Sequence, residues 1–228
     1  MPGTVGMMHM AGGGICGVPR AGPRRLAALA LAAALAASTC ARPADYIVPR
    51  YESAEAWVPV FDDPARDDWQ KPDEVIRALL LPPDAVVADI GSGTGYFAVR
   101  LARAVPRGRV LGVDIEPDMV RYLNKRAERE SLPNLASYRG DADDPRLPTP
   151  VDVAIFVGVY HHIARREQYF RRVRAALKRG GRVAIIDAFR IPPEQVKQEL
   201  ARAGFELAQE HSFLPDQYFL VFRPAALN

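Results

Sequence analysis

Cysteine is almost absent from this chain of 228 residues, which contains only Cys16 and Cys40. Both precede the part of the sequence that is typical of a folded domain, so neither a disulfide framework nor a zinc site built from thiolates is expected. The adjacent His161 and His162 do not have the spacing that places two metal ligands on one face of a helix. We therefore expect no metal site.

Charge of one sign does not dominate the composition either. The formal net charge is +3, and the arginines are distributed among acidic residues instead of forming a long basic run. This balance does not require nucleic acid as a partner, and none is expected. The length and the hydrophobic fraction of 49% are sufficient for one domain with a full-sized core.

An apolar run long enough to cross a membrane is missing from the N-terminal segment. The Ala/Leu run at residues 26–37 follows a cluster of arginines and precedes the small residues of positions 38–41. A spanning helix needs roughly 18 to 20 apolar residues, so this layout is typical of a signal peptide. We expect residues 1–44 to be a signal-like or disordered segment that exports the chain or associates it with a membrane, with Cys40 as a candidate lipid-attachment site. The alternative is a cytoplasmic protein with a disordered leader or a start further downstream.

The remaining sequence predicts an α/β domain over residues 73–228, because short β-branched apolar runs alternate with longer amphipathic stretches. Expected strands are residues 85–90, 109–114, 136–139, 151–157, 182–187, 205–213 and 218–223. Expected helices are residues 73–81, 95–104, 117–131, 165–178 and 193–203. Gly180 and Gly181 have the position of a stop after the helix at 165–178. The last two strands are close enough to form an antiparallel hairpin.

Residues 45–72 are rich in Asp, Pro and Trp and show no sustained period. We expect them to form an extended arm or short helices that lead into the domain and cover its site as a lid. The aromatic residues that such an arm would contribute to a pocket are Tyr46, Tyr51, Trp57 and Trp69. Simple packing over the sheet is the alternative for each of them.

A glycine loop lies in residues 86–102, VVADIGSGTGYFAVRLA, between a buried strand and a helix that begins at once. Gly91, Gly93 and Gly95 allow positive φ in the turn and have no Cβ to keep a ligand from the backbone. The free amides at the helix start attract a negative group.

The spacing of this loop distinguishes it from other glycine loops. The pattern is GlyXGlyXGly and not the GlyXGlyXXGly of nicotinamide and flavin binders, and no LysSer or LysThr follows it as in a phosphate loop. Asp89, two residues before Gly91, would repel a pyrophosphate but attract an ammonium group. A nicotinamide-dependent oxidoreductase is thus the less favoured alternative.

Acidic residues follow the next two expected strands. Asp114 stands about 19 residues after Gly95, close to the ~20 expected for a carboxylate that reaches ribose hydroxyls. Ile115 is placed to lie against an adenine face. Asp141, in the segment GDADDP at 140–145, is placed to accept from an adenine amino group, although a solvated turn is the alternative for residues 141–144.

The segments DIGSGTG, VLGVDIEPDM, GDADDPRLP, VYHHI and LKRGGRVAIID resemble the class I S-adenosylmethionine-dependent methyltransferases in order and spacing. The resemblance covers roughly residues 68–224. It implies a doubly wound Rossmann-like sheet of order 3-2-1-4-5-7-6 with an antiparallel C-terminal strand, and S-adenosylmethionine as cofactor. It also implies cofactor contacts from Asp89, Gly91, Ser92, Gly93, Gly95, Asp114, Ile115, Asp141 and Ala142.

The segment VGVYHHI at 157–163 follows the expected fourth strand, at the sheet edge where ligands bind in this architecture. His161 and His162 are the candidate catalytic residues, because a histidine near neutral pKa can remove a proton from a methyl acceptor. The alternative for each is a packing or solvated role. Asp187, at the end of the fifth strand, is a further candidate for the pocket.

The expected function is methyl transfer to an unidentified, small-molecule acceptor by a monomeric enzyme. One departure from the family keeps a second interpretation open. The join between the fifth strand and the next helix, residues 188–192, is shorter than in related sequences. A substrate lid would then be incomplete, and a non-catalytic module that only binds S-adenosylmethionine is the alternative.

Overall fold

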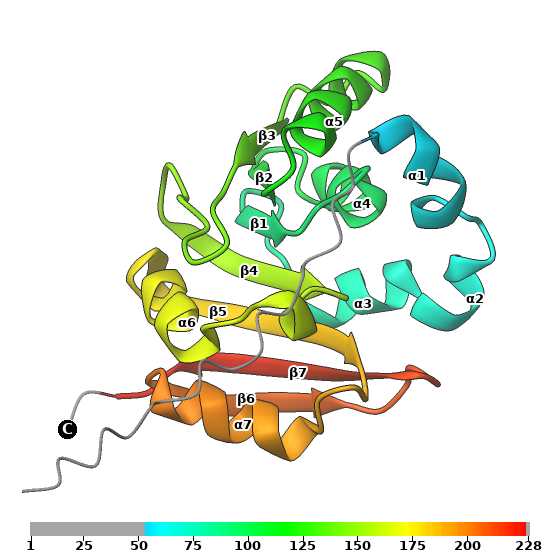
Figure 1. The fold of residues 1–228 in the computed structure, drawn as a ribbon. Helices are drawn as coiled ribbons and strands as arrows, with labels where there is room; N and C mark the ends of the chain where they lie inside the picture. Colours follow the sequence, from blue (N-terminus) through cyan, green and yellow to red (C-terminus); the bar gives the residue numbers. More distant parts are fainter. Residues whose placement is uncertain (1–52, 227–228) are drawn as a thin grey trace, which may run out of the picture. The chain divides into compact units, whose positions relative to one another are not determined.

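The computed structural model describes residues 53–226, which form an α/β domain around a seven-stranded sheet (Figure 1). The expected signal-like segment at residues 1–44 lies outside the described residues, as do Tyr46 and Tyr51 of the arm. Export, lipidation at Cys40 and membrane association therefore stay predictions. Among the helices of the described part, none is both long enough and apolar enough to cross a bilayer.

The sheet has the strand order β3-β2-β1-β4-β5-β7-β6. Only β7 runs antiparallel to its neighbours, β5 and β6. This arrangement confirms the doubly wound fold, the implied strand order and the C-terminal hairpin. The strands are β1 (Val86–Ile90), β2 (Arg109–Asp114), β3 (Leu135–Arg139), β4 (Val151–Val157), β5 (Leu177–Ala188), β6 (Phe205–His211) and β7 (Gln217–Pro224).

Helices cover both faces of the sheet (Figure 1). Alternate residues of β4 show why, since Val153 and Ile155 belong to one apolar cluster, and Ala154 and Phe156 belong to the other. The helices after the first strand are α4 (Tyr96–Ala104), α5 (Pro117–Arg129), α6 (Arg166–Ala175) and α7 (Pro193–Arg202), with the short 3-10 helix η1 (Tyr160–His162) after β4.

The arm consists of short helices, one of the two forms expected for it. Its elements are α1 (Ala54–Phe61), α2 (Arg66–Gln70) and α3 (Pro72–Ala78). Ser53 accepts from the amide of Ala56 and caps α1, and Pro72 begins α3 at a position where no amide hydrogen is needed. Local start signals thus define α1 and α3 although the arm has no apolar period.

The prediction for the junction between α6 and β5 is wrong. Helix α6 ends at Ala175, and Gly180 and Gly181 lie inside β5 instead of stopping a helix. The strand begins early because Leu177 pairs with Val151 before a register shift. A Cβ on Gly181 would lie 3.0 Å from the carbonyl oxygen of Val151, so this glycine allows two strands to approach closely.

Candidate functional site

A cavity of about 670 Å³ lies at the carboxyl ends of β1, β2 and β4. Strand β1 lies between β2 and β4, so the chain connections diverge there and leave a crevice in which doubly wound domains bind ligands. The residues predicted from the sequence that line this cavity are Asp89, Gly91, Ser92, Gly93, Asp114, Ile115, Asp141, Ala142 and His162. Its volume is typical of sites for small molecules and cofactors.

The glycine loop is held against the end of β2 by its own amides. The amide of Gly91 donates to the carbonyl oxygen of Val113 at 2.7 Å, and the amide of Gly93 donates to Asp114 Oδ2 at 2.9 Å. The predicted positive φ is present at all three glycines. The loop is therefore preorganised, but the amide of Gly93 already has a partner and is not free for a ligand.

Gly95 has a different role from the one expected. It does not line the cavity, and a Cβ built on it would lie 2.3 Å from Leu123 Cδ1 of α5. The close approach of α5 to the loop, and not the approach of a ligand, excludes a side chain here. A side chain at Gly91 would also overlap with the protein itself, because a Cβ built there would lie 2.2 Å from Val159 Cγ2.

Replacing Gly95 with alanine should lower the free energy of unfolding by about 2 to 5 kcal/mol, since strain at positive φ adds to an overlap in the core. Gly180→Ala is the matched control, because Gly180 also has positive φ (+79°) but has no atom within 4 Å of its Cβ position. It should cost only the strain, about 1 to 2 kcal/mol. Urea denaturation measures both. Equal losses would show that contact with Leu123 is not what requires glycine.

Asp114 lies at the end of β2, and each of its carboxylate oxygens accepts one hydrogen bond from a backbone amide. Oδ2 accepts from Gly93, and Oδ1 accepts from the amide of Glu116 at 3.0 Å. Burial raises the pKa of this carboxyl group. Each oxygen of a carboxylate has a second lone pair, so Asp114 can still accept from two hydroxyl groups of a ligand.

Asp89 lies at the end of β1, and its side chain is almost fully buried. Burial raises its pKa to about 7, the nearby Asp114 contributes in the same direction, and the amide of Ala98 in the first turn of α4 opposes both. The charge of Arg66 also opposes the increase, and a ligand ammonium close to the carboxyl group would favour its ionised form further.

The turn after β3 places only some of its acidic residues at the cavity. Asp141 and Ala142 line it, and Asp141 Oδ2 pairs with Arg146 at 2.5 Å. Asp143 does not line it and instead pairs with Arg172 at 3.1 Å. The alternative of a solvated turn therefore describes part of this segment.

The two histidines differ in their position relative to the cavity. His162 lines the cavity, whereas His161 does not. His161 Nδ1 lies 2.9 Å from each oxygen of the buried Asp187, and its backbone amide donates to Asp187 Oδ2 at 3.2 Å. Asp187 is also absent from the cavity, so its predicted role in the pocket is wrong. Asp187 instead holds η1 in place through its contacts with His161.

His162 has the properties of a neutral imidazole. Burial lowers its pKa, and the neighbouring His161, whose ring centroid lies 4.0 Å away, contributes in the same direction. A histidine that is neutral at pH 7 can accept a proton from a hydroxyl or thiol group.

The arm supplies two cavity residues that the sequence did not indicate. Arg66 and Gln70 line the cavity from α2, beside the predicted Trp69, and Gln70 Nε2 donates to Gln217 Oε1 of β7 at 3.1 Å. Trp57, in contrast, does not line the cavity and stacks on Phe61 with centroids 5.4 Å apart. The aromatic prediction thus holds for Trp69 at the cavity but not for Trp57.

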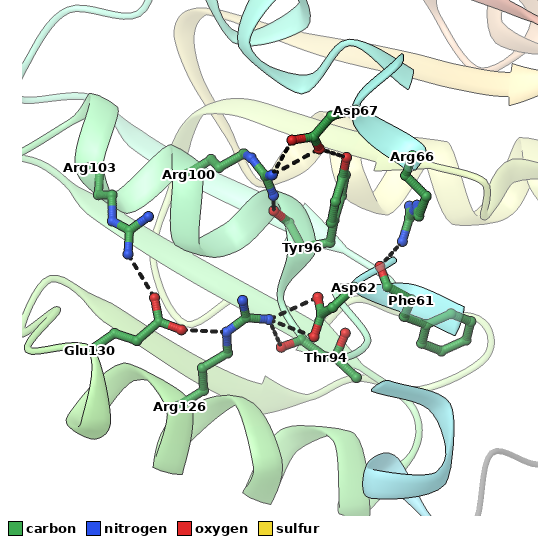
Figure 2. Close-up of polar contacts among 10 residues, drawn as sticks. All are labelled: Phe61, Asp62, Arg66, Asp67, Thr94, Tyr96, Arg100, Arg103, Arg126 and Glu130. Carbon is green, nitrogen blue, oxygen red and sulfur yellow. Dashed lines mark hydrogen bonds and ion pairs between the residues drawn. The ribbon is translucent and has the colours of Figure 1, made fainter. Parts of the chain in front are cut away.

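Polar contacts fasten the arm to the glycine loop (Figure 2). Arg126 of α5 binds both oxygens of Asp62 at 2.9 Å and donates to the carbonyl oxygen of Thr94 in the loop at 3.0 Å. Glu130 holds the same guanidinium from its other side at 2.7 Å. One arginine therefore joins the arm, the loop and α5.

Comparisons with known proteins agree with this geometry. Residues 87–181 match the family model of a methyltransferase domain. The chain is 30% identical over 115 residues to an arsenite methyltransferase of Halobacterium salinarum. The aligned segment covers 50% of this chain and 29% of that protein. It is 28% identical over 154 residues to a tRNA (guanine-N(7)-)-methyltransferase of Saccharophagus degradans, which covers 59% of this chain and 67% of that protein.

A solved structure shows the same fold. The crystal structure of an S-adenosylmethionine-dependent methyltransferase from Aquifex aeolicus superposes with a TM-score of 0.66 at 22% identity, over 73% of this chain and 96% of that one. The chain is also 30% identical over 122 residues, or 54% of its length, to a trans-aconitate 2-methyltransferase of Rhodopseudomonas palustris. It spans only part of these relatives, less than a third of the arsenite methyltransferase and 43% of the trans-aconitate 2-methyltransferase.

The fold and the site define a Rossmann-like domain with a nucleoside-binding crevice, because a preorganised glycine loop and a buried carboxylate at the end of β2 lie on one cavity. Residues 87–181 match a methyltransferase domain, and the surrounding fold is that of the class I S-adenosylmethionine-dependent methyltransferases. S-adenosylmethionine is the cofactor of this class, and the residues present fit it, since Asp114 retains acceptor capacity for a ribose and Asp89 for an ammonium group.

Proposed function

We propose that this chain transfers the methyl group of S-adenosylmethionine to a small-molecule acceptor. The observation that carries the proposal is that one cavity is lined both by the candidate cofactor residues, such as Asp89 and Asp114, and by the candidate acceptor residues Trp69, Gln70 and His162. An acceptor bound there would be held next to the cofactor and away from bulk water, and this alignment supplies much of the rate of a displacement reaction.

The cofactor residues divide by the part of the ligand that they suit. Asp114 would accept from the ribose hydroxyls, and Ile115, Asp141 and Ala142 would surround the adenine. Asp89, Gly91, Ser92 and Gly93 would lie along the amino-acid end. These roles are supported by the position of each residue on the cavity.

The acceptor end combines one base with polar and aromatic groups. S-adenosylmethionine, when bound, supplies a methyl group that is already activated by its sulfonium. His162 would take the proton that a hydroxyl or thiol acceptor loses. His161 would act as a positioning residue, because its contacts with Asp187 hold η1 and therefore the backbone next to His162.

Acceptor class can be tested by incubating the protein and S-adenosylmethionine with dialysable metabolites, with total tRNA, or with ribosomal protein. Release of S-adenosylhomocysteine, measured by mass spectrometry, should require the dialysable fraction. Release with only tRNA or ribosomal protein would contradict the small-molecule part of the proposal. Binding of the cofactor with transfer to none of the fractions would favour the non-catalytic module, which the short join between β5 and α7 supports.

The raised pKa of Asp89 predicts a pH dependence of cofactor binding. Below pH 7 the side chain is mostly neutral in the free protein, and it must lose its proton to attract the ligand ammonium. The affinity for S-adenosylhomocysteine should therefore increase as the pH rises from 6 through about 7 and then level off. Asp89→Asn should bind more weakly and lose this increase. Titration calorimetry over this pH range measures both, and a wild-type affinity that does not change with pH would contradict the assigned role.

A further inference from the structure

Arg66 is a cationic residue of the cavity wall whose partners within the described residues are all neutral. Its Nε donates to Gln70 Oε1 at 3.0 Å, and its Nη1 donates to the carbonyl oxygen of Phe61. Within residues 53–226, no carboxylate lies within ion-pair distance of this guanidinium. The side chain is thus positioned by neutral groups while its charge is not compensated by direct contact.

Arg100 provides an internal comparison. The two arginines lie on either side of the Tyr96 ring, with guanidinium carbons 4.0 Å (Arg66) and 4.2 Å (Arg100) from its centroid (Figure 2). Arg100 is paired with both oxygens of Asp67, at 2.9 and 3.2 Å, and does not line the cavity. Of the two, only Arg66 faces the cavity without a carboxylate partner.

The environment of Arg66 favours an anionic ligand. Burial lowers its pKa, although Tyr96 and the charges of Asp62 and Asp67, which do not contact the guanidinium directly, act in the opposite direction. An arginine nevertheless remains protonated in proteins, so burial leaves a cation with an unfavourable desolvation energy. A carboxylate from a ligand would relieve this energy and match the planar guanidinium.

The position of Arg66 indicates which part of a ligand it would meet. It packs on Tyr96, the first residue of α4 directly after the glycine loop, and it interacts electrostatically with Asp89. The wall near the loop therefore has one acidic and one cationic group. An amino acid is complementary to this pair, since it carries an ammonium group and a carboxylate on the same carbon atom.

We propose that Arg66 binds the α-carboxylate of the methionyl moiety of the cofactor while Asp89 binds its ammonium group. The proposal rests on the proposed function, because it assumes that S-adenosylmethionine occupies this cavity. It makes α2 of the arm a specificity element that distinguishes the intact cofactor from nucleosides without the amino acid. An acceptor carboxylate has the same chemistry, so the test must separate the two sources.

The test is titration calorimetry with S-adenosylhomocysteine and with methylthioadenosine, which has the nucleoside and the sulfur but no amino-acid group. Arg66→Gln should weaken the binding of S-adenosylhomocysteine by about 10- to 100-fold, the value of one charge-assisted contact, and should leave methylthioadenosine nearly unaffected. Arg66→Lys should recover part of the loss. Arg100→Gln, the matched control on the same ring, should leave the ratio of the two affinities unchanged.

The outcomes distinguish this inference from the proposed function. Wild-type affinities of Arg66→Gln for both ligands would overturn the assignment alone, and this is also the result expected if Arg66 binds an acceptor carboxylate. Equal weakening of both ligands would overturn it as well, because Arg66 would then support the fold of the arm. Failure of the wild-type protein to bind either nucleoside would contradict the proposed function, and this assignment with it.

Discussion

Replacing Asp114 with alanine is expected to reduce the affinity for S-adenosylhomocysteine by at least about 100-fold, because two charge-assisted hydrogen bonds to the ribose would be lost. The substitution also removes the acceptor for the amide of Gly93, so the loop loses the contact that holds it to β2. The side chain thus contributes both directly and by preorganisation. Titration calorimetry measures the loss.

Asp152→Ala is the matched control for this variant. Asp152 also binds a neighbouring backbone amide, that of Val86 at 2.7 Å, and pairs with Lys178 at 2.7 Å, but it does not line the cavity. This control should bind S-adenosylhomocysteine like the wild type even if it is somewhat less stable. An Asp114→Ala protein that is folded and has wild-type affinity would refute the assignment of this carboxylate to the ribose.

Replacing His162 with glutamine is expected to lower turnover by at least about 100-fold, the usual contribution of a general base, on an acceptor that loses a proton. The affinity for S-adenosylhomocysteine should change little, because the base is needed only for the acceptor. His161→Gln should have a smaller effect, since His161 does not line the cavity. Steady-state rates with the acceptor found in the fraction assay provide the comparison.

The pH profile gives an independent test of the same histidine. Because burial and His161 lower the pKa of His162, the imidazole stays neutral to lower pH than an exposed histidine does. With S-adenosylmethionine saturating at each pH, the acidic limb of kcat/KM for the acceptor should therefore lie below pH 6.5, and His162→Gln should lose it. A limb above pH 6.5 or full activity of the variant would exclude His162 as the base.

The central strands could be predicted closely because they are buried on both faces and therefore appear as continuous apolar runs. The predicted bounds of β2 and β4 agree with the structure. The early start of β5 could not be predicted, because the glycines at 180 and 181 are equally typical of a helix stop and of a close approach between strands. Local sequence does not distinguish these two causes.

The candidate site was predictable where chain order alone places a residue at the carboxyl edge. Asp89 and Asp114 lie at the ends of β1 and β2, Asp141 follows shortly after β3, and all three line the cavity. His161 and Gly95 are also close in sequence to the edge, but the His161 side chain is turned toward Asp187 and Gly95 faces Leu123 of α5. Sequence position predicts the neighbourhood of a residue and not the direction that it faces.

The contribution of the arm could not be predicted, because it depends on tertiary contacts between distant segments. Gln70 meets Gln217 across 147 positions of the chain, and Asp62 meets Arg126 across 64. No period or motif marks Arg66 as a cavity residue. Only the packing of α2 on Tyr96 reveals it.

A crystal structure of the protein with S-adenosylhomocysteine tests the central claim most directly. The account predicts the nucleoside in the cavity, with its ribose hydroxyls in hydrogen-bonding distance of Asp114 and its amino-acid end between Asp89 and the glycine loop. A nucleoside bound elsewhere, or bound in this cavity with its ribose away from Asp114, would contradict it.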